Sequence, residues 1–288
     1  MGSPKISVII PAYNVERYIK QCVETVLYNS FKDFEIIVVN DGSTDGTYTI
    51  LKKLVTEDER IRVFTTSNKG LSAARNFGIR QARGEYFTFV DGDDYVNEYY
   101  LEKLYQQVLD YDARLVITEH YRYQEENNMC YYSFFEPDFR IERLSQKELL
   151  GKSHSLSYTT AWAKLYHRSL FDNIRFPEGM YYEDTFVINK LYLQVPFAIH
   201  VIDNLYCYRM NDLSISGGQL TIRKIEDNVR AIEEAILDLY LTHNDSYIYV
   251  EIYKTMLYSH REYLLERGFI DEPILKRINY RLQTMNRG

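Results

Sequence analysis

The chain has 288 residues, with 34 Lys and Arg against 41 Asp and Glu and a net charge of -7. This length allows a large core and one catalytic domain with a smaller addition, whereas the acidic balance, without a basic tract, argues against nucleic-acid binding. The sequence shows neither an apolar run near ~18 residues nor a signal peptide, so we expect a cytoplasmic protein, and its three scattered cysteines indicate reduced thiols.

Short apolar runs alternate with helical patterns in the first part of the chain. Each apolar run ends in a polar or Gly-rich segment that suits a turn or a helix cap. This β-α alternation is typical of a mostly parallel sheet with right-handed crossovers, so the polar segments should meet at one sheet edge. The predicted strands cover 5–10, 35–40, 61–65 and the run that ends at Asp91. The first predicted helix covers 15–28, the second begins near 47, and the third follows the third strand and ends near 82.

The fourth apolar run stops abruptly on three carboxylates, those of Asp91, Asp93 and Asp94. Phe87 and Phe89 suit a buried strand that is too short for a helix, so the acids lie at its carboxyl end. Ligands bind at that edge in open α/β sheets, and clustered carboxylates repel one another unless a divalent metal or a polar ligand compensates. A turn with an Asp cap is the alternative on the residues alone.

Four ordered segments carry a family resemblance. They are Ser7-Val-Ile-Ile-Pro-Ala-Tyr-Asn14, Val38-Val-Asn-Asp-Gly-Ser-Thr-Asp45, Asn68-Lys-Gly-Leu-Ser-Ala-Ala-Arg-Asn76 and Val90-Asp-Gly-Asp-Asp94. In order and spacing they resemble family 2 glycosyltransferases, and four ordered matches are much more specific than one. The resemblance implies an α/β, Rossmann-like GT-A fold with a mostly parallel central sheet flanked by helices. It also implies transfer of a sugar from a nucleotide diphosphate to an acceptor hydroxyl, with inversion of the anomeric carbon.

The resemblance implies roles for residues of these segments. Tyr13 would offer a flat face to the nucleotide base, and Asp41 would accept a hydrogen bond from a uracil N–H, which fits a uridine donor. Arg75 would lie near the base and the acid cluster and hold carboxylate or nucleotide oxygens. Each residue also has an ordinary explanation in packing, a surface ion pair or a turn. The implied nucleotide-sugar residues are Pro11, Tyr13, Glu16, Asp41, Gly70, Arg75, Asp91 and Gly92.

The same resemblance implies a metal ion at the acid cluster. Asp93 would be the direct ligand and Asp91 would contact the ribose side of the nucleotide. Asp94 is a weaker candidate that would support these residues without binding the ion directly. Departure of a nucleotide diphosphate leaves negative charge on phosphate oxygens, which a hard divalent ion with oxygen ligands stabilises. We therefore expect Mn²⁺ or Mg²⁺ as cofactor, and the six His show no zinc-type spacing.

The second half resembles a common subgroup of this family through Ala161-Trp-Ala-Lys-Leu-Tyr166 and Phe176-Pro-Glu-Gly-Met-Tyr-Tyr-Glu-Asp-Thr-Phe186. Asp184 matches the general base that removes the acceptor hydroxyl proton, and Glu183 would orient it or bind acceptor hydroxyls. Capping of a helix by two acids is the alternative. Trp162 suits either the C–H face of a sugar or the core.

Arg209 lies in Tyr206-Cys-Tyr-Arg-Met-Asn-Asp-Leu-Ser-Ile-Ser216, which resembles the close of the catalytic domain in this subgroup. We expect Arg209 at the donor diphosphate, because guanidinium pairs well with phosphate, and Lys164 at the acceptor or the diphosphate. After Gly217-Gly218 the helical spacing predicts a helical C-terminal subdomain. The predicted domains are 1–216, divided into a nucleotide-binding half over 1–110 and an acceptor-binding half over 111–216, and the helical subdomain over 217–288.

The expected partners are a UDP-sugar donor and a glycan acceptor. The sugar stays open between glucose, galactose and N-acetylglucosamine, and the acceptor between a protein-linked glycan, a polysaccharide and a lipid-linked saccharide; the last would bring peripheral membrane contact. The many C-terminal Tyr residues suit either a subunit or acceptor interface or packing on the catalytic domain.

Two other functions are alternatives for this sequence. A sugar-nucleotide nucleotidyltransferase would need a Gly-rich basic loop after the first strand, which Pro11-Ala-Tyr-Asn14 is not. A non-catalytic nucleotide-sugar-binding partner would not need the acids Asp91, Asp93 and Asp184.

Overall fold

A computed structural model describes residues 3–132, 140–210 and 219–286. Its strands are β1 (Ile6–Ala12), β2 (Phe34–Asn40), β3 (Ile61–Thr65), β4 (Tyr86–Phe89), β5 (Tyr95–Val96), β6 (Leu115–Gln124), β7 (Met129–Tyr132), β8 (Arg140–Ser145), β9 (Lys164–His167) and β10 (Phe197–Met210). Its helices are α1 (Ile19–Leu27), α2 (Thr47–Glu57), α3 (Leu71–Gln81), α4 (Tyr100–Tyr111), α5 (Gln146–Lys152), α6 (Leu156–Thr159), the 3₁₀ turn η1 (Arg168–Phe171), α7 (Glu183–Tyr192), α8 (Ile222–Leu241), α9 (Tyr247–Glu266) and α10 (Pro273–Met285).

All of these strands join one sheet. Its order is β3-β2-β1-β4-β9-β6-β10-β5, with β7 added to β6 and β8 to β10. The four strands of the N-terminal half pair in parallel, as the sequence predicts. Beyond them β9 runs antiparallel between β4 and β6, while β6 and β10 are parallel. The sequence pattern did not predict the antiparallel strand that joins the two halves.

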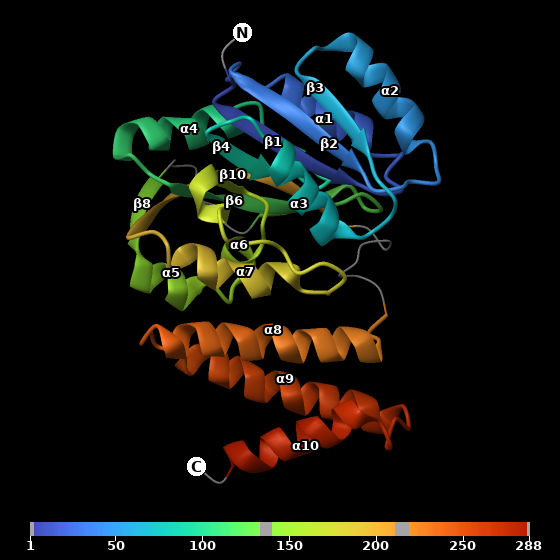
Figure 1. Cartoon of the computed structure of the whole chain (residues 1–288), viewed down its shortest axis with the longest axis vertical. Coiled ribbons are helices and arrows are strands. Elements are labelled where there is room, and N and C mark those ends of the chain that lie inside the picture. Colours follow the sequence, from blue (N-terminus) through green and yellow to red (C-terminus); the bar gives the residue numbers. More distant parts are fainter. Residues whose placement is uncertain (1–2, 133–139, 211–218, 287–288) are drawn as a thin grey trace.

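Helices cover both faces of the sheet, which explains the continuous apolar runs of β1 and β2. Val8 packs in one core cluster with Val23 of α1, and Ile9 packs in the other with Ala74 of α3. Gly78 lets α3 approach the sheet closely, because a Cβ there would lie 2.3 Å from the side chain of Ile9. Because β1, β2 and β4 are parallel, their carboxyl ends meet at one edge of the sheet, beside the start of α3 (Figure 1).

The first helix begins later than predicted, at Ile19 instead of residue 15. The backbone N–H of Val15 donates to the Thr47 hydroxyl at 2.9 Å, so residues 15–18 form a turn that ties the β1 loop to α2. The other elements of the first half lie within a few residues of their predicted positions.

The predicted C-terminal helices are present as α8, α9 and α10, which stack beyond α7 (Figure 1). They share one apolar cluster with α7, and Lys190 of α7 donates to Glu234 at 3.0 Å and to Asp238 at 2.6 Å. Tyr249 is buried against the Ser153 hydroxyl, whereas Tyr240 is 70% exposed, so the tyrosines divide between packing and surface. None of the helices in the described part of the chain is long and apolar enough to cross a bilayer.

Candidate active site

The acidic segment after β4 forms a tight loop whose backbone N–H of Asp94 donates to the carbonyl of Asp91 at 2.9 Å. Gly92 allows this turn, because a Cβ there would lie 2.9 Å from the carbonyl oxygen of Pro11. The Asp94 carboxyl is buried; it accepts from the Tyr206 hydroxyl at 2.7 Å and from the backbone N–H of Arg209 at 2.8 Å. Burial, with the nearby acids, raises the pKa of Asp94 well above its usual range. Asp94 therefore fixes the loop from within.

Arg75 of α3 joins the acidic loop to the second half of the chain. Its buried guanidinium lies 3.0 Å from the Asp91 carboxylate, 2.7 Å from Glu183 and 3.0 Å from Asp184. Burial disfavours the charge, but the carboxylates of Asp91, Asp184 and Glu183 raise the pKa of Arg75. One cation thus holds the predicted ribose-side acid and the predicted general base on opposite sides of its planar fork.

The acid pair opens α7, as the sequence predicts. Tyr182 precedes it in the left-handed conformation, with φ of 60°. Asp184 is held at both oxygens, by Arg75 and by the backbone N–H of Ala161, which donates at 3.0 Å. Each carboxylate oxygen still has a free lone pair, so Asp184 retains acceptor capacity.

Both acids of the pair hold protons more tightly than usual. Burial, followed by the charge of Asp184, raises the pKa of Glu183 to about 7. Burial also raises the pKa of Asp184, against the opposing effect of Arg75. Raised carboxyl pKa values beside a charged partner in a polar cluster are typical of functional acids.

We expect Glu183→Gln to flatten the pH dependence of stability between about pH 4.5 and 7. The folded protein binds the Glu183 proton more tightly than the unfolded chain, so this contribution is complete at low pH and is lost as pH rises through about 7. Urea unfolding over a pH series measures it. Glu57→Gln on the exposed face of α2 is the control and should keep the wild-type slope. An unchanged slope in Glu183→Gln would contradict the raised pKa.

The predicted nucleotide residues lie on the adjacent loops. Tyr13 is 47% exposed after β1, in a position open to a ligand. Asp41 is buried and holds the segment before α3: it accepts from the Thr66 hydroxyl at 3.0 Å and from the backbone N–H of Gly70 at 2.7 Å. Glu16 accepts from the backbone N–H of Gly46 and so holds the loop after β2. Asp41 and Glu16 thus organise loops, and their contact with a nucleotide stays a prediction.

Three other predicted residues are buried. Trp162 stacks on Tyr206 at 4.6 Å between ring centroids, and Lys164 donates to the carbonyls of Ser157 and Thr160 at 2.7 and 2.6 Å. Burial lowers the pKa of Lys164 to about 7. Arg209 is 3% exposed and donates to the carbonyl of Asp93 at 2.8 Å, while residues 211–216 of its motif and the Gly217-Gly218 boundary lie outside the described residues. Trp162 thus lies in the core, which is one of its two predicted alternatives, and substrate contacts of Lys164 and Arg209 stay predictions.

Tyr206 and Asn14, which the sequence does not single out, complete the arrangement. Tyr206 of β10 accepts from the backbone N–H of Asp91 at 3.1 Å, besides donating to Asp94. Asn14 accepts from the backbone N–H of Thr44 at 2.8 Å and joins the first two loops. Both lie inside quoted motifs, which is the only signal that the sequence offers for them.

A divalent ion fits this site only together with the donor. In the described part of the chain, no group of three or more His, Cys, Asp or Glu forms a ready-made metal cluster. Asp94 accepts from protein donors at both oxygens and Asp91 pairs with Arg75, so both acids also hold the loop, and Asp93 as the ligand of an ion stays a prediction. Mg²⁺-type sites often use one or two carboxylates and complete the shell with substrate phosphates and water.

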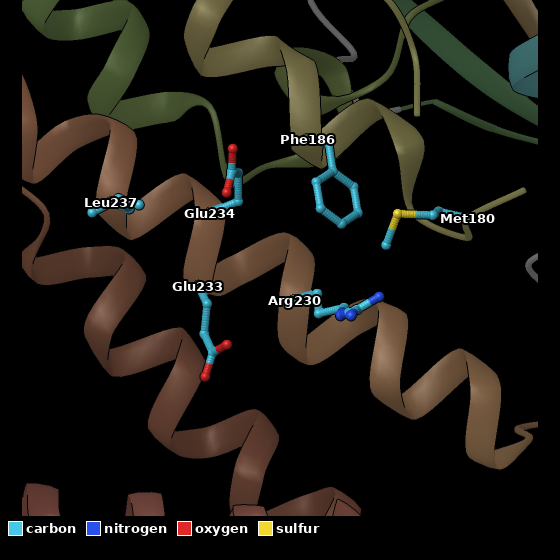
Figure 2. A pocket seen from close by; sticks show the side chains of 6 residues that line it. All are labelled: Met180, Phe186, Arg230, Glu233, Glu234 and Leu237. Carbon is cyan, nitrogen blue, oxygen red and sulfur yellow. The ribbon is translucent and has the colours of Figure 1, made fainter. Parts of the chain in front are cut away.

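A groove of about 400 Å³ lies between α7 and α8, beside the segment that carries the acid pair (Figure 2). Phe186 and Met180 line it from one side and Arg230 from the other. Glu233 also lines it, and accepts from the Tyr253 hydroxyl of α9 and pairs with Arg281 of α10. The groove lies on the α8 side of α7, and its lining does not include Glu183 or Asp184, whose carboxylates face Arg75.

A family model described as Glycosyl transferase family 2 matches residues 7–175. GlyG, a glycosyltransferase of Streptococcus pneumoniae serotype 4, is 33% identical over 288 residues, covering 98% of this chain and 96% of that protein. A Campylobacter jejuni protein, GalNAc(5)-diNAcBac-PP-undecaprenol beta-1,3-glucosyltransferase, is 28% identical, over 78% of this chain and 75% of its own length. The crystal structure of S. aureus TarS in complex with UDP-GlcNAc matches with a TM-score of 0.69 at 21% identity, covering 95% of this chain and 78% of that chain, which confirms the predicted fold.

Proposed function

This chain belongs to glycosyl transferase family 2 and is a glycosyltransferase, and from that premise we propose that it transfers a hexose or N-acetylhexosamine from a UDP-sugar to a hydroxyl of a glycan acceptor. The observation that carries the proposal is the Arg75 cluster, in which the acidic donor loop and the acid pair of α7 meet at one guanidinium. A donor and an acceptor that react must meet at such a point.

Support for a uridine donor comes from Asp41 and from the structural neighbour. Asp41 lies at the end of β2, where the family resemblance implies contact with uracil. TarS, which shares the fold, has been solved with UDP and with UDP-GlcNAc. Support for a glycan acceptor comes from the C. jejuni relative, whose name specifies an undecaprenol-linked saccharide. Peripheral membrane contact and self-association through the C-terminal helices stay predictions.

In the proposed reaction Asp184 removes the proton of the acceptor hydroxyl. That oxygen bonds to the anomeric carbon as the bond from this carbon to the UDP oxygen breaks, so a single displacement inverts the carbon. Arg75 and the backbone N–H of Ala161 orient the Asp184 carboxylate, and the burial that raises its pKa makes it a stronger base. Arg75 also holds Asp91, so the base keeps its position relative to the donor loop.

We propose Asp93 as the ligand of a divalent ion, Mn²⁺ or Mg²⁺, that binds with the donor diphosphate. When bound, such an ion supplies charge stabilisation to the departing diphosphate. Asp94 keeps the loop that carries Asp93 in shape, through Tyr206 and the backbone of Arg209.

The experiment that tests the function is binding and hydrolysis of UDP-glucose, UDP-galactose and UDP-N-acetylglucosamine by the purified protein, with Mn²⁺ and with EDTA. Metal-dependent release of UDP from one sugar supports the proposal and identifies the donor. Absence of binding to every uridine nucleotide would overturn the donor assignment and favour a non-catalytic role. Formation of a sugar nucleotide from a sugar phosphate and UTP would favour a nucleotidyltransferase instead.

Asp93→Ala is expected to lower turnover of the UDP-sugar by about 10²-fold or more, because several kcal/mol of charge stabilisation are lost. Adding more Mn²⁺ should not restore it. Asp110→Ala, an exposed Asp on α4, is the control and should retain full activity. Wild-type turnover in Asp93→Ala would exclude Asp93 as the metal ligand.

A further inference from the structure

Arg209, near the end of β10, lies in a cage of aromatic rings. Its guanidinium carbon is 4.7 Å from the ring centroid of Tyr18, 5.3 Å from that of Tyr95 and 5.5 Å from that of Tyr123. These rings come from the start of α1, from β5 and from β6. Cation–π contacts of this kind gain strength when the cation is desolvated, as it is here at 3% exposure. Three separate elements thus fix one guanidinium.

Arg209 also donates hydrogen bonds to two successive residues of the acidic loop. Its Nε donates to the carbonyl oxygen of Asp93 at 2.8 Å, and its backbone N–H donates to the Asp94 carboxylate at 2.8 Å. A second guanidinium nitrogen donates to Gln21 of α1 at 2.7 Å, and the third lies 3.9 Å from a carboxylate oxygen of Glu125. The planar fork of arginine serves these directions together, which a lysine ammonium cannot reproduce.

We propose that Arg209 is a positioning residue that fixes the backbone at Asp93, and thereby the carboxylate that meets the ion and the donor diphosphate. The proposal rests on the proposed function for its ligand. It replaces the direct diphosphate contact that the sequence predicts for Arg209, since all three guanidinium nitrogens have partners inside the protein. Arg209 acts on the donor through Asp93 and makes no contact with phosphate itself.

The test compares the UDP affinity of variants in the presence and in the absence of the metal. Arg209→Lys keeps the charge and loses the fork, and Gln21→Ala removes one anchor of the guanidinium from an exposed position on α1. Arg143→Lys is the matched control: that guanidinium lies over Phe197, 4.0 Å from the ring centroid, at the opposite end of β10. Calorimetry measures the affinity of each protein for UDP with saturating Mn²⁺ and with EDTA.

If Arg209 is a positioning residue, its variants should lose UDP affinity only when the metal is present. UDP affinity in Mn²⁺ should fall about tenfold in Arg209→Lys, which corresponds to about 1.4 kcal/mol, and by less in Gln21→Ala. With EDTA both variants should bind UDP as the wild type does, and Arg143→Lys should match the wild type in both conditions. An equal loss with EDTA would mean direct phosphate contact and would overturn the proposal, as would unchanged affinity in Mn²⁺.

A second measurement needs no nucleotide. Hydrogen exchange in the peptide that spans 91–96 should be faster in Arg209→Lys than in the wild type and unchanged in Arg143→Lys. If Arg209→Lys does not fold, Gln21→Ala should show a smaller change in the same direction. Wild-type protein that binds no UDP would reject the proposed donor, but the exchange result would still decide the positioning role. Unchanged exchange at 91–96 in a folded variant overturns it.

Discussion

Asp184→Asn should lower kcat for sugar transfer by a factor of about 10²–10⁴, the usual contribution of a general base. The amide keeps the shape of the carboxylate but cannot take up the acceptor proton. UDP affinity should stay within about threefold of the wild type, since a factor of three is less than 1 kcal/mol and Asp184 acts on the acceptor. Steady-state transfer kinetics and calorimetry with UDP measure the two effects separately.

A matched control lies close by. Asp238→Asn removes another partly buried carboxylate, which pairs with Lys190 of α7, the helix that Asp184 opens. It should leave kcat near the wild-type value. If Asp184→Asn retained wild-type kcat, or if Asp238→Asn lost as much activity, Asp184 would not be the base.

Arg75→Met is expected to lower the free energy of unfolding by about 3–5 kcal/mol at neutral pH, the usual cost of removing one partner of a buried ion pair. Methionine fills part of the space but leaves Asp91, Glu183 and Asp184 without their shared cation. Transfer should be lost as well, because the donor loop and the base lose their common anchor. Urea unfolding and transfer assays provide the measurements.

The loss of stability in Arg75→Met should shrink as pH falls. Without the guanidinium the pKa values of Glu183 and Asp184 rise further, and protonation then removes unpaired negative charge. Arg60→Met is the control, because its pair with Asp58 is partly exposed and such pairs contribute about 0–1 kcal/mol. A loss in Arg75→Met no larger than that of Arg60→Met would show that the buried cluster does not depend on its cation.

The sequence predicts the first half of the fold well, because its signals are local. β3 lies at the predicted 61–65, where an apolar run is bounded by polar turns. Asp91 and Asp184 were predicted through family motifs and in fact share Arg75. That contact spans 109 residues from Arg75 to Asp184, and no periodicity reports it.

Non-local packing also decides the surroundings of Arg209 and Lys164. The sequence offers only the charge of Arg209, which suggests phosphate, whereas its surroundings come from Tyr18, Tyr95 and Tyr123, which are far apart in the sequence. The buried ammonium of Lys164 donates to the carbonyls of Ser157 and Thr160, and residue spacing alone does not reveal this geometry. The burial of these two side chains is visible only in the structure, and any proposal that they contact substrate directly or indirectly depends on it.

The stack of Trp162 on Tyr206 has a consequence for how the protein opens. Trp162 follows Ala161, whose N–H holds the candidate base, and Tyr206 holds the backbone of Asp91 and the carboxyl of Asp94. A fluctuation that parts the two rings disturbs the donor loop and the base together. Such contiguous parts open as one cooperative unit, so we expect the two halves of the site to share a single local-unfolding free energy.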